Sequence, residues 1–226
     1  TNLRAVPMSA LGLGALLLEG RDPRAAEWLD VVRRSFEDFH DLYEKDGSYP
    51  EGTGYATYTS GELILLLHAL RRRHDDGWAD AINWRGHMDF FLFTRMPSDR
   101  HPEGHVNFGD GGNGFHSDVA FWIARHYRGG RAQYAAANHA GPHRIFSPVF
   151  FDPDVVPEPP TGPWHARRFA IGWFVVTTGF RSRDLVVALR SGSPANHEHA
   201  DRNSVILKAF GENLLVDAWH PPYERR

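Results

Sequence analysis

The chain has 226 residues, of which 42% are hydrophobic and 13% aromatic, so it can bury a substantial core and the bulk of it is not expected to be disordered. Its formal net charge of -3 gives no overall attraction to nucleic acid or to an anionic membrane surface. It contains no cysteine, so disulfides are excluded and any metal must be bound by His, Asp or Glu.

The N-terminal part contains the longest apolar run, around Leu11 to Leu18. This run is interrupted by Gly12 and Gly14 and is too short to cross a bilayer, which takes about 20 apolar residues. We therefore expect no membrane insertion. The sequence starts at Thr1 without a basic and apolar leader, so we expect the natural N-terminus to lie upstream.

The first part of the chain is predicted to form helices in series. Apolar and small residues recur at helical spacing from Arg4 to Leu18, and the clearest amphipathic pattern runs from Pro23 to about Tyr43. Further helices are expected at Leu63 to Leu70, at about Trp78 to Phe93 and at about His116 to Tyr127. Helices joined by short turns, without strand-like alternation between them, favour an array of αα-hairpins, a bundle or a toroid.

The composition changes between Pro142 and Pro163, where seven prolines and little periodicity predict a linker or a long covering loop. We place the domain boundary there, with a helical part at 1–141, the linker at 142–165 and a β domain at 166–226. The β domain is predicted from four apolar runs between turns, Ile171 to Thr178, Asp184 to Leu189, Ser204 to Ala209 and Asn213 to Val216. Four strands leave an unfinished sheet, so we expect the chain to be a fragment of a larger protein.

The most informative motif is the segment 196–204, Asn-His-Glu-His-Ala-Asp-Arg-Asn-Ser, which leads into an apolar strand. It places His197 and His199 on a short turn, and Asp217 ends the next strand. Imidazoles and carboxylates that converge where two strands pair can transfer protons or bind a metal. A pair of His with this spacing is also common on surface turns, while Asp201 fits an Asx-turn and Asp217 fits a strand-end cap.

Four stretches, in this order, resemble the heparinase II/III-like polysaccharide lyases, whose relatives include alginate and oligoalginate lyases. They are Asn2 at the start of a helix of small residues, Asp46-Gly47-Ser48-Tyr49-Pro50-Glu51-Gly52 leading into Tyr55 and Tyr58, Asn107-Phe108-Gly109-Asp110, and His197-x-His199-x-Asp201 with Asp217 downstream. The resemblance covers nearly the whole chain. It implies a multidomain α+β fold, in which an incomplete (α/α) toroid of helical hairpins is followed by the start of an antiparallel β-sandwich, with polysaccharide bound in the cleft between them.

The resemblance also implies an activity, which is cleavage of a uronate-containing polysaccharide such as a glycosaminoglycan or alginate by β-elimination. Elimination removes the weakly acidic proton beside the uronate carboxylate, once the charge of that carboxylate is neutralised. Asn2 is implied as the neutralising group, His197 as the base, and Tyr55 as the acid or as shared acid and base. Tyr58 stays an alternative to Tyr55 because it lies three residues further on the same helical face.

Other residues are implied as ligands of the sugar or of a metal. Glu51, Asn107 and Asn196 are expected near the substrate, although Glu51 also suits a helix N-terminus and Asn107 a loop that lines the cleft. His199 and Asp217 match two ligands of a structural zinc ion, whose further His would lie beyond Arg226 in the family pattern. Zinc is therefore the one cofactor we expect, with an incomplete site in this chain.

The expected partner is an acidic polysaccharide or oligosaccharide and not nucleic acid, and the resemblance favours a periplasmic or secreted bacterial protein. Leu3 stands where many relatives have His or an aromatic residue after the neutralising Asn, which suggests a narrower role or a different substrate. The sequence leaves two alternatives, a non-catalytic carbohydrate-binding protein and a glycoside hydrolase, which needs opposed carboxylates about 5 to 9.5 Å apart. His101, His105 and His116 fit no recognised zinc spacing.

Overall fold

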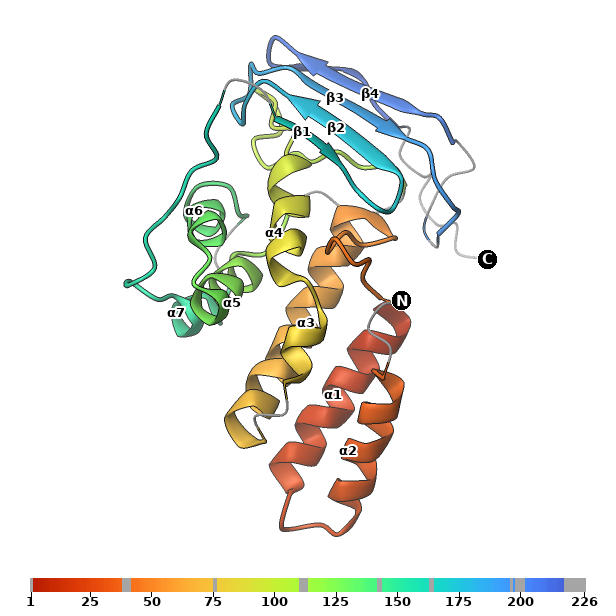
Figure 1. Cartoon of the computed structure of the whole chain (residues 1–226), viewed down its shortest axis with the longest axis vertical. Coiled ribbons are helices and arrows are strands. Elements are labelled where there is room, and N and C mark those ends of the chain that lie inside the picture. Colours follow the sequence, from red (N-terminus) through yellow and green to blue (C-terminus); the bar gives the residue numbers. More distant parts are fainter. Residues whose placement is uncertain are drawn as a thin grey trace.

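The computed structural model describes residues 2–37, 42–74, 77–109, 114–141, 144–162, 165–195, 197 and 202–217. In this part of the chain, a set of helices carries an antiparallel sheet of five strands at one end (Figure 1). The order of the elements, helices first and strands last, confirms the predicted α+β class.

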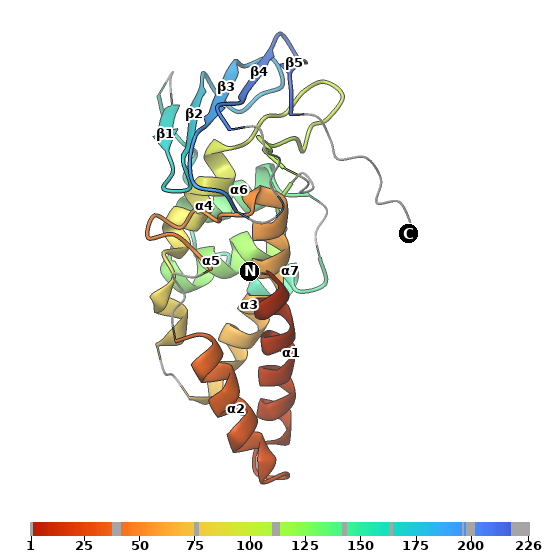
Figure 2. The ribbon, with the colours of Figure 1, turned by 90° about the vertical axis from the view of Figure 1, so that its right-hand side faces the viewer.

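The first three helices form the elongated part of the molecule. They are α1 (Asn2–Leu18), α2 (Arg24–Ser35) and α3 (Gly52–Arg73). Helix α1 packs against both α2 and α3, and Figure 2 shows α1 and α2 side by side. Helix α2 ends at Ser35 and not near Tyr43 as predicted. The backbone of Phe36 leaves the helical conformation (φ -114°, ψ 15°), and its ring instead packs edge-on against Trp78.

Helix α3 begins eleven residues before the apolar run that predicted it at Leu63 to Leu70. The buried side of its first half is made of small and hydroxyl-bearing residues, Thr53, Ala56, Thr57, Thr59 and Ser60. Two of these hydroxyls bind buried tyrosines, since Tyr43 Oη lies 3.0 Å from Ser60 Oγ and Tyr49 Oη lies 3.0 Å from Thr59 Oγ1. The helix is therefore held by polar pairs that an apolar periodicity does not reveal.

The helix predicted from Trp78 to Phe93 is divided into a 3₁₀ turn η2 (Trp78–Ala81) and helix α4 (Trp84–Phe93). The division occurs because Asn83 caps α4, with its side chain accepting a hydrogen bond from Gly86 N at 2.8 Å. Helix α5 (Ser117–Tyr127) agrees with the prediction to within one residue.

Two helices were not expected from the sequence. Helix α6 (Gly130–Asn138) follows the Gly129-Gly130 pair, which indicates a break, and it packs on α5. Helix α7 (Ser147–Phe150) lies in the proline-rich segment and also packs on α5.

The sheet runs in chain order from one edge to the other, and every pairing is antiparallel. Its strands are β1 (His165–Arg168), β2 (Trp173–Thr177), β3 (Val186–Arg190), β4 (Val205–Ala209) and β5 (Glu212–Leu215). Four of them coincide with the predicted apolar runs. The fifth, β1, was missed because its sequence His-Ala-Arg-Arg has no apolar alternation, which an edge strand paired on one side does not require.

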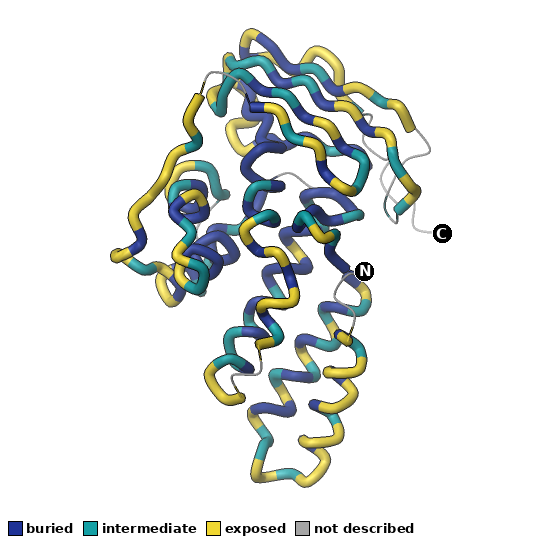
Figure 3. Tube along the Cα trace, viewed as in Figure 1, coloured by how far each residue is buried: buried dark blue, intermediate teal, exposed yellow. Residues whose placement is uncertain are grey.

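The inner face of the sheet packs on α4. Phe90 contacts Phe169 and Trp173, at ring-centroid distances of 5.1 and 5.7 Å, and Phe93 contacts His165 at 5.5 Å. These contacts join the helical and β parts into one core, which the dark tube of Figure 3 follows up α4.

The outer face of the sheet carries a cross-strand row of Phe174, Leu189 and Val205, all exposed. The described residues contain this one sheet, so a second sheet of a sandwich stays a prediction, as does closure of the helices into a toroid. Among the described residues, no helix combines the length and the apolar character needed to cross a bilayer.

Candidate functional site

The Asp46-Gly47-Ser48 turn joins the helical part to the sheet next to the start of α3. Gly47 has φ +84°, and a Cβ at this position would lie 2.2 Å from the backbone N of His87, so the turn requires glycine. Asp46 Oδ1 accepts hydrogen bonds from the N–H and the hydroxyl of Ser48, and Asp46 Oδ2 accepts one from Ala170 N at 2.7 Å. This motif is therefore structural, and it fixes the N-terminal end of α3 against the β1–β2 connection.

Glu51 and His197 meet at this junction between helix and sheet. Glu51 immediately precedes α3, and its side chain is only 4% exposed. His197 comes from the connection between β3 and β4 and has a left-handed backbone, φ +58°. Its Nδ1 lies 3.3 Å from Glu51 Oε2. A carboxylate beside Nδ1 favours a proton on that nitrogen and leaves Nε2 with the lone pair that a base needs.

Tyr55 covers one face of the His197 ring. The two ring centroids are 3.7 Å apart and the planes are inclined by 15°, which is a parallel stack. Glu51 and Tyr55 are four residues apart at the start of α3, so they project from the same side. The imidazole thus has a carboxylate oxygen near its edge and a phenol ring on its face, both supplied by the start of α3 and the residue before it.

Tyr58 lies one helical turn beyond Tyr55, and its side chain is 46% exposed. The structure therefore distinguishes the two tyrosines by position, because Tyr55 is the one stacked on His197. Tyr58 is placed as a surface residue next to the same site.

Asn2 is the first residue of α1 and is buried. Its Oδ1 has no hydrogen-bond partner within the described part of the protein. Helix α1 packs along α3, and its N-terminal end points toward the sheet in both ribbon views (Figures 1 and 2). Asn2 therefore lies at the end of the helical part that also holds Glu51 and Tyr55.

Asn107 and Asp217 belong to a neighbouring groove of about 310 Å³, which His101 and His105 also line. Asn107 Nδ2 donates to the carbonyl of Gly109 at 2.8 Å, and Gly109 N donates to Asp217 Oδ2 at 2.9 Å. These bonds fasten the loop after Asn107 to the end of β5. In this arrangement Asp217 acts as the strand-end acceptor considered from the sequence.

The predicted zinc ligands are not brought together in the part of the chain that the structure describes. Asn196, His199 and Asp201 lie outside the described residues, and within those residues no three His, Cys, Asp or Glu side chains converge to hold a metal. His105 is fully buried, and this burial lowers its pKa to about 3, so it is a neutral core residue. Zinc at His199 and Asp217 stays a prediction from the sequence, and no chemical step is assigned to it.

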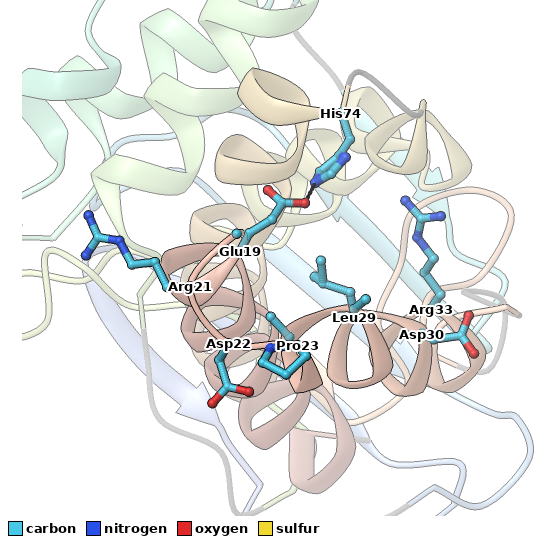
Figure 4. A pocket seen from close by; sticks show the side chains of 11 residues that line it. Glu19, Arg21, Asp22, Pro23, Leu29, Asp30, Arg33 and His74 are labelled. Atoms are coloured by element: carbon cyan, nitrogen blue, oxygen red, sulfur yellow. Dashed lines mark ion pairs between the residues drawn. The ribbon is translucent and has the colours of Figure 1, made fainter.

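A second groove, of about 630 Å³, lies at the far end of the helices (Figure 4). It is bordered by the end of α1, the start of α2 and His74 after α3, where Glu19 Oε1 lies 3.1 Å from His74 Nε2. Its lining mixes cations and carboxylates in solvent and contains none of the residues implicated by the sequence. Size alone therefore does not identify the functional site.

Comparisons with known proteins show solved structures that share this fold. No protein-family model matches the chain, and no curated protein matches it. Among solved structures, heparinase III superimposes with a TM-score of 0.64 over 94% of this chain at 15% identity. A heparan sulfate lyase, HepC from Pedobacter heparinus, gives 0.62 over 94% at 11% identity, and a second heparinase III gives 0.66 over 97% at 12% identity.

These similarities establish the fold, and they confirm at that level the resemblance seen in the sequence motifs. The chain spans about a third of the length of the matched proteins, namely 34% of the first heparinase III, 32% of HepC and 32% of the second heparinase III.

The contact between Glu51 and His197 could not be found from the sequence, because 146 positions separate the two residues. The available signal was indirect. Glu51 and Tyr55 share one helical side only if α3 starts near Gly52, and the apolar pattern placed that start too late.

Proposed function

We propose that this chain is part of a polysaccharide lyase that cleaves a uronate-containing chain by β-elimination. The observation that carries the proposal is the stack of Tyr55 on His197 with Glu51 at the imidazole edge. A base and a phenol placed next to each other are the pair that elimination needs, one to take the proton from carbon and the other to protonate the departing glycosidic oxygen. The fold shared with heparinase III and HepC supports the same class of reaction.

The chemistry assigns one task to each side chain. The amide of Asn2 donates hydrogen bonds to the uronate carboxylate, which lowers the negative charge that opposes loss of the neighbouring carbon-bound proton. His197 Nε2 takes that proton. The hydroxyl of Tyr55 gives a proton to the departing glycosidic oxygen, and the electron pair left on carbon forms the double bond of the product. Water takes no part.

Glu51 is assigned to His197 and not to the sugar. Its carboxylate is buried and faces Nδ1, so it orients the ring and favours the tautomer in which Nε2 is unprotonated.

The experiment measures the ultraviolet absorbance of the unsaturated product with heparan sulfate, other glycosaminoglycans and alginate as substrates, using the longest available form of the protein that contains this chain. Tyr55→Phe and His197→Ala are expected to lower turnover by about 10²-fold or more, the scale of a positioned acid or base. Tyr58→Phe is the matched control and should keep most of the activity.

Three outcomes would contradict parts of the proposal. Equal activity of Tyr55→Phe and the unchanged protein removes Tyr55 from the mechanism, and a large loss in Tyr58→Phe alone transfers the role to Tyr58. If the whole panel gives no unsaturated product while acidic oligosaccharides still bind, the protein is a carbohydrate-binding relative of the lyases and not an enzyme.

A further inference from the structure

A hydrogen-bonded pair of basic side chains, Arg144 and His116, lies beside α3, one turn beyond Tyr58, where nothing in the proposed reaction requires it. Arg144 Nη1 donates to His116 Nδ1 at 2.7 Å. Both groups lie against Gly61, where an added Cβ would be 3.0 Å from Arg144 Nη1 and 3.3 Å from His116 Nδ1. The absence of a side chain at Gly61 is therefore what lets the guanidinium and the imidazole rest on the helix.

The backbone on both sides of the pair is fixed. Arg144 N donates to Ser147 Oγ at 3.0 Å, and Ser147 Oγ lies 2.8 Å from Ser117 Oγ at the start of α5. His116 N donates to Thr57 Oγ1 at 2.9 Å, which ties the start of α5 directly to α3. The pair is therefore built into the junction of α3, α5 and α7 and is not a free surface side chain.

Of the Arg144 guanidinium and the Asp118 carboxylate, only the guanidinium can be reached by solvent and ligands. Asp118 Oδ2 lies 3.8 Å from Arg144 Nη1, but the Asp118 side chain is 1% exposed whereas that of Arg144 is 37% exposed. The Asp118 carboxylate therefore faces the guanidinium from the buried side of the junction. Partial burial of His116 lowers the pKa of its imidazole, and the nearby charge of Arg144 lowers it further. The ring is therefore neutral, with Nδ1 as the acceptor and the N–H on Nε2.

The pair lies beside α3, the helix that also carries the proposed site. Gly61 is buried under the pair and follows Tyr58 by three residues, so the two positions are neighbours on the helix. It is six residues after Tyr55, or about 9 Å along the helix axis. A group bound at Arg144 therefore belongs to a different sugar from the one that contacts Tyr55 and His197.

We propose that Arg144 and His116 form an anion subsite, which binds a carboxylate or sulfate on a sugar flanking the cleaved bond. This inference rests on the proposed function for its substrate class. The guanidinium provides the planar fork that pairs with both kinds of oxyanion, and the imidazole holds that fork in place. His116 and Arg144 are binding and positioning residues and take no part in the elimination.

The test measures equilibrium binding of two oligosaccharides to the chain by calorimetry, one a sulfated heparin oligosaccharide and one an unsulfated oligouronate. Arg144→Gln is expected to weaken binding roughly tenfold, the scale of one charge-assisted ion pair. Arg183→Gln removes a charge from an exposed arginine in the β2–β3 connection and is the matched control, with binding kept within about twofold.

Gly61→Ala is the second variant, because Arg144→Gln leaves the buried Asp118 without its cation and can affect folding. Alanine favours the helix, while its Cβ requires the guanidinium to shift by a few tenths of an ångström, so the protein should stay folded and bind more weakly, although less so than in Arg144→Gln. Weaker binding of both oligosaccharides in the two variants assigns the site to carboxylate, and weaker binding of the sulfated one alone assigns it to sulfate.

Unchanged binding of both ligands in Gly61→Ala and Arg144→Gln overturns the subsite, and so does the absence of binding to the unchanged chain. These results are independent of turnover. In an active parent protein, Arg144→Gln should raise KM with little change in kcat. If neither KM nor kcat changes, the subsite is refuted while the proposed elimination still stands.

Discussion

In the proposed site, the carboxylate of Glu51 lies beside one of the two ring nitrogens of His197, Nδ1. Its carboxylate is almost fully buried, and it lies 3.3 Å from Nδ1 on the side of the ring that faces the helix. A buried carboxylate oxygen needs a polar neighbour, and the imidazole of His197 is one. In the proposed reaction Nε2, on the opposite edge of the ring, is the nitrogen that acts as the base, and Tyr55 lies against the face of that ring.

We expect Glu51→Gln to lower kcat about 10- to 100-fold with little change in KM, which is part of the roughly 10²- to 10⁴-fold that a positioned acid–base group contributes. Glutamine keeps the shape of the side chain and removes the charge that orients the imidazole. The helix should not suffer, because the side chain of Glu51 forms no capping hydrogen bond to α3. The measurement is a steady-state comparison of kcat and KM in the active parent protein.

Glu62→Gln is the control for this change, since Glu62 lies on the same helix at a more exposed position. Equal losses of kcat in the two variants would show that any lost carboxylate on α3 has the same effect, and the positioning role of Glu51 would be wrong.

Most residues of the candidate site could be predicted from the sequence, whereas the contacts between them could not. Tyr55, His197 and Glu51 were all named from short motifs that resemble the heparinase II/III-like lyases, with a helix-start role also open for Glu51. Which tyrosine touches the histidine depends on the rotation of α3 and on the path of the β3–β4 connection. Both are set by contacts that are distant in the sequence.

At the scale of elements, Lys208 holds the sheet to two loops. Its side chain is buried in β4, and Nζ donates to the carbonyls of Pro97 at 2.8 Å, Arg181 at 3.0 Å and Ser182 at 2.9 Å. Burial lowers the pKa of Lys208 to about 8, which leaves the group mostly protonated at pH 7, with three N–H groups for three acceptors.

Lys208→Met should therefore destabilise the protein by about 3 kcal/mol, because it leaves buried carbonyls without donors although it keeps the length of the side chain. The measurement is the free energy of unfolding by urea at pH 7. Lys45→Met alters the other lysine of the chain, which is exposed, and should change stability by less than about 0.5 kcal/mol. Similar values for the two variants would refute the role of Lys208.

Helix α6 and the first half of α3, which the sequence did not predict, share a physical cause. Helix α6 and the first half of α3 are rich in Gly, Ala, Ser and Thr, so their buried sides carry no large apolar residues. Strand β1 needs one neighbour and little burial. By contrast, α5 and strands β2 to β4 bury Val, Ile, Phe or Trp at regular spacing, and these were predicted nearly to the residue.

At the scale of the whole molecule, the sheet and helices are joined by a core that contains a buried polar chain as well as aromatic rings. His87 Nδ1 lies 2.7 Å from the carbonyl of Gly47, which can only accept, so Nδ1 carries the proton. His87 Nε2, 2.8 Å from Ser60 Oγ, then accepts from that hydroxyl, and Ser60 Oγ accepts in turn from Tyr43. Each of these hydrogen bonds therefore has one direction, and this set of directions requires a neutral imidazole at His87.

Buried histidines, including His87, make the stability of the protein depend on pH. Burial lowers the pKa of His87 from 6.5 to about 4, and burial also lowers the pKa of His126 and of His139 to about 4. Between about pH 6.5 and pH 4 the unfolded chain binds more protons than the folded one, so stability is complete above pH 6.5 and falls as the pH drops toward 4. For the fully buried His87, the shift corresponds to roughly 3 kcal/mol.

We expect His87→Gln to be less stable than the unchanged protein at pH 7, because it breaks the hydrogen bonds to Gly47 and Ser60, and to lose less stability on acidification because the titrating group is gone. The free energy of unfolding, measured by urea at pH 7, 6, 5 and 4.5, gives both quantities. His101→Gln, at an exposed position, should keep the full pH dependence. If His87→Gln has the same slope as the unchanged protein, its imidazole is not kept neutral by the fold, and the hydrogen-bond directions deduced for Ser60 and Tyr43 are wrong.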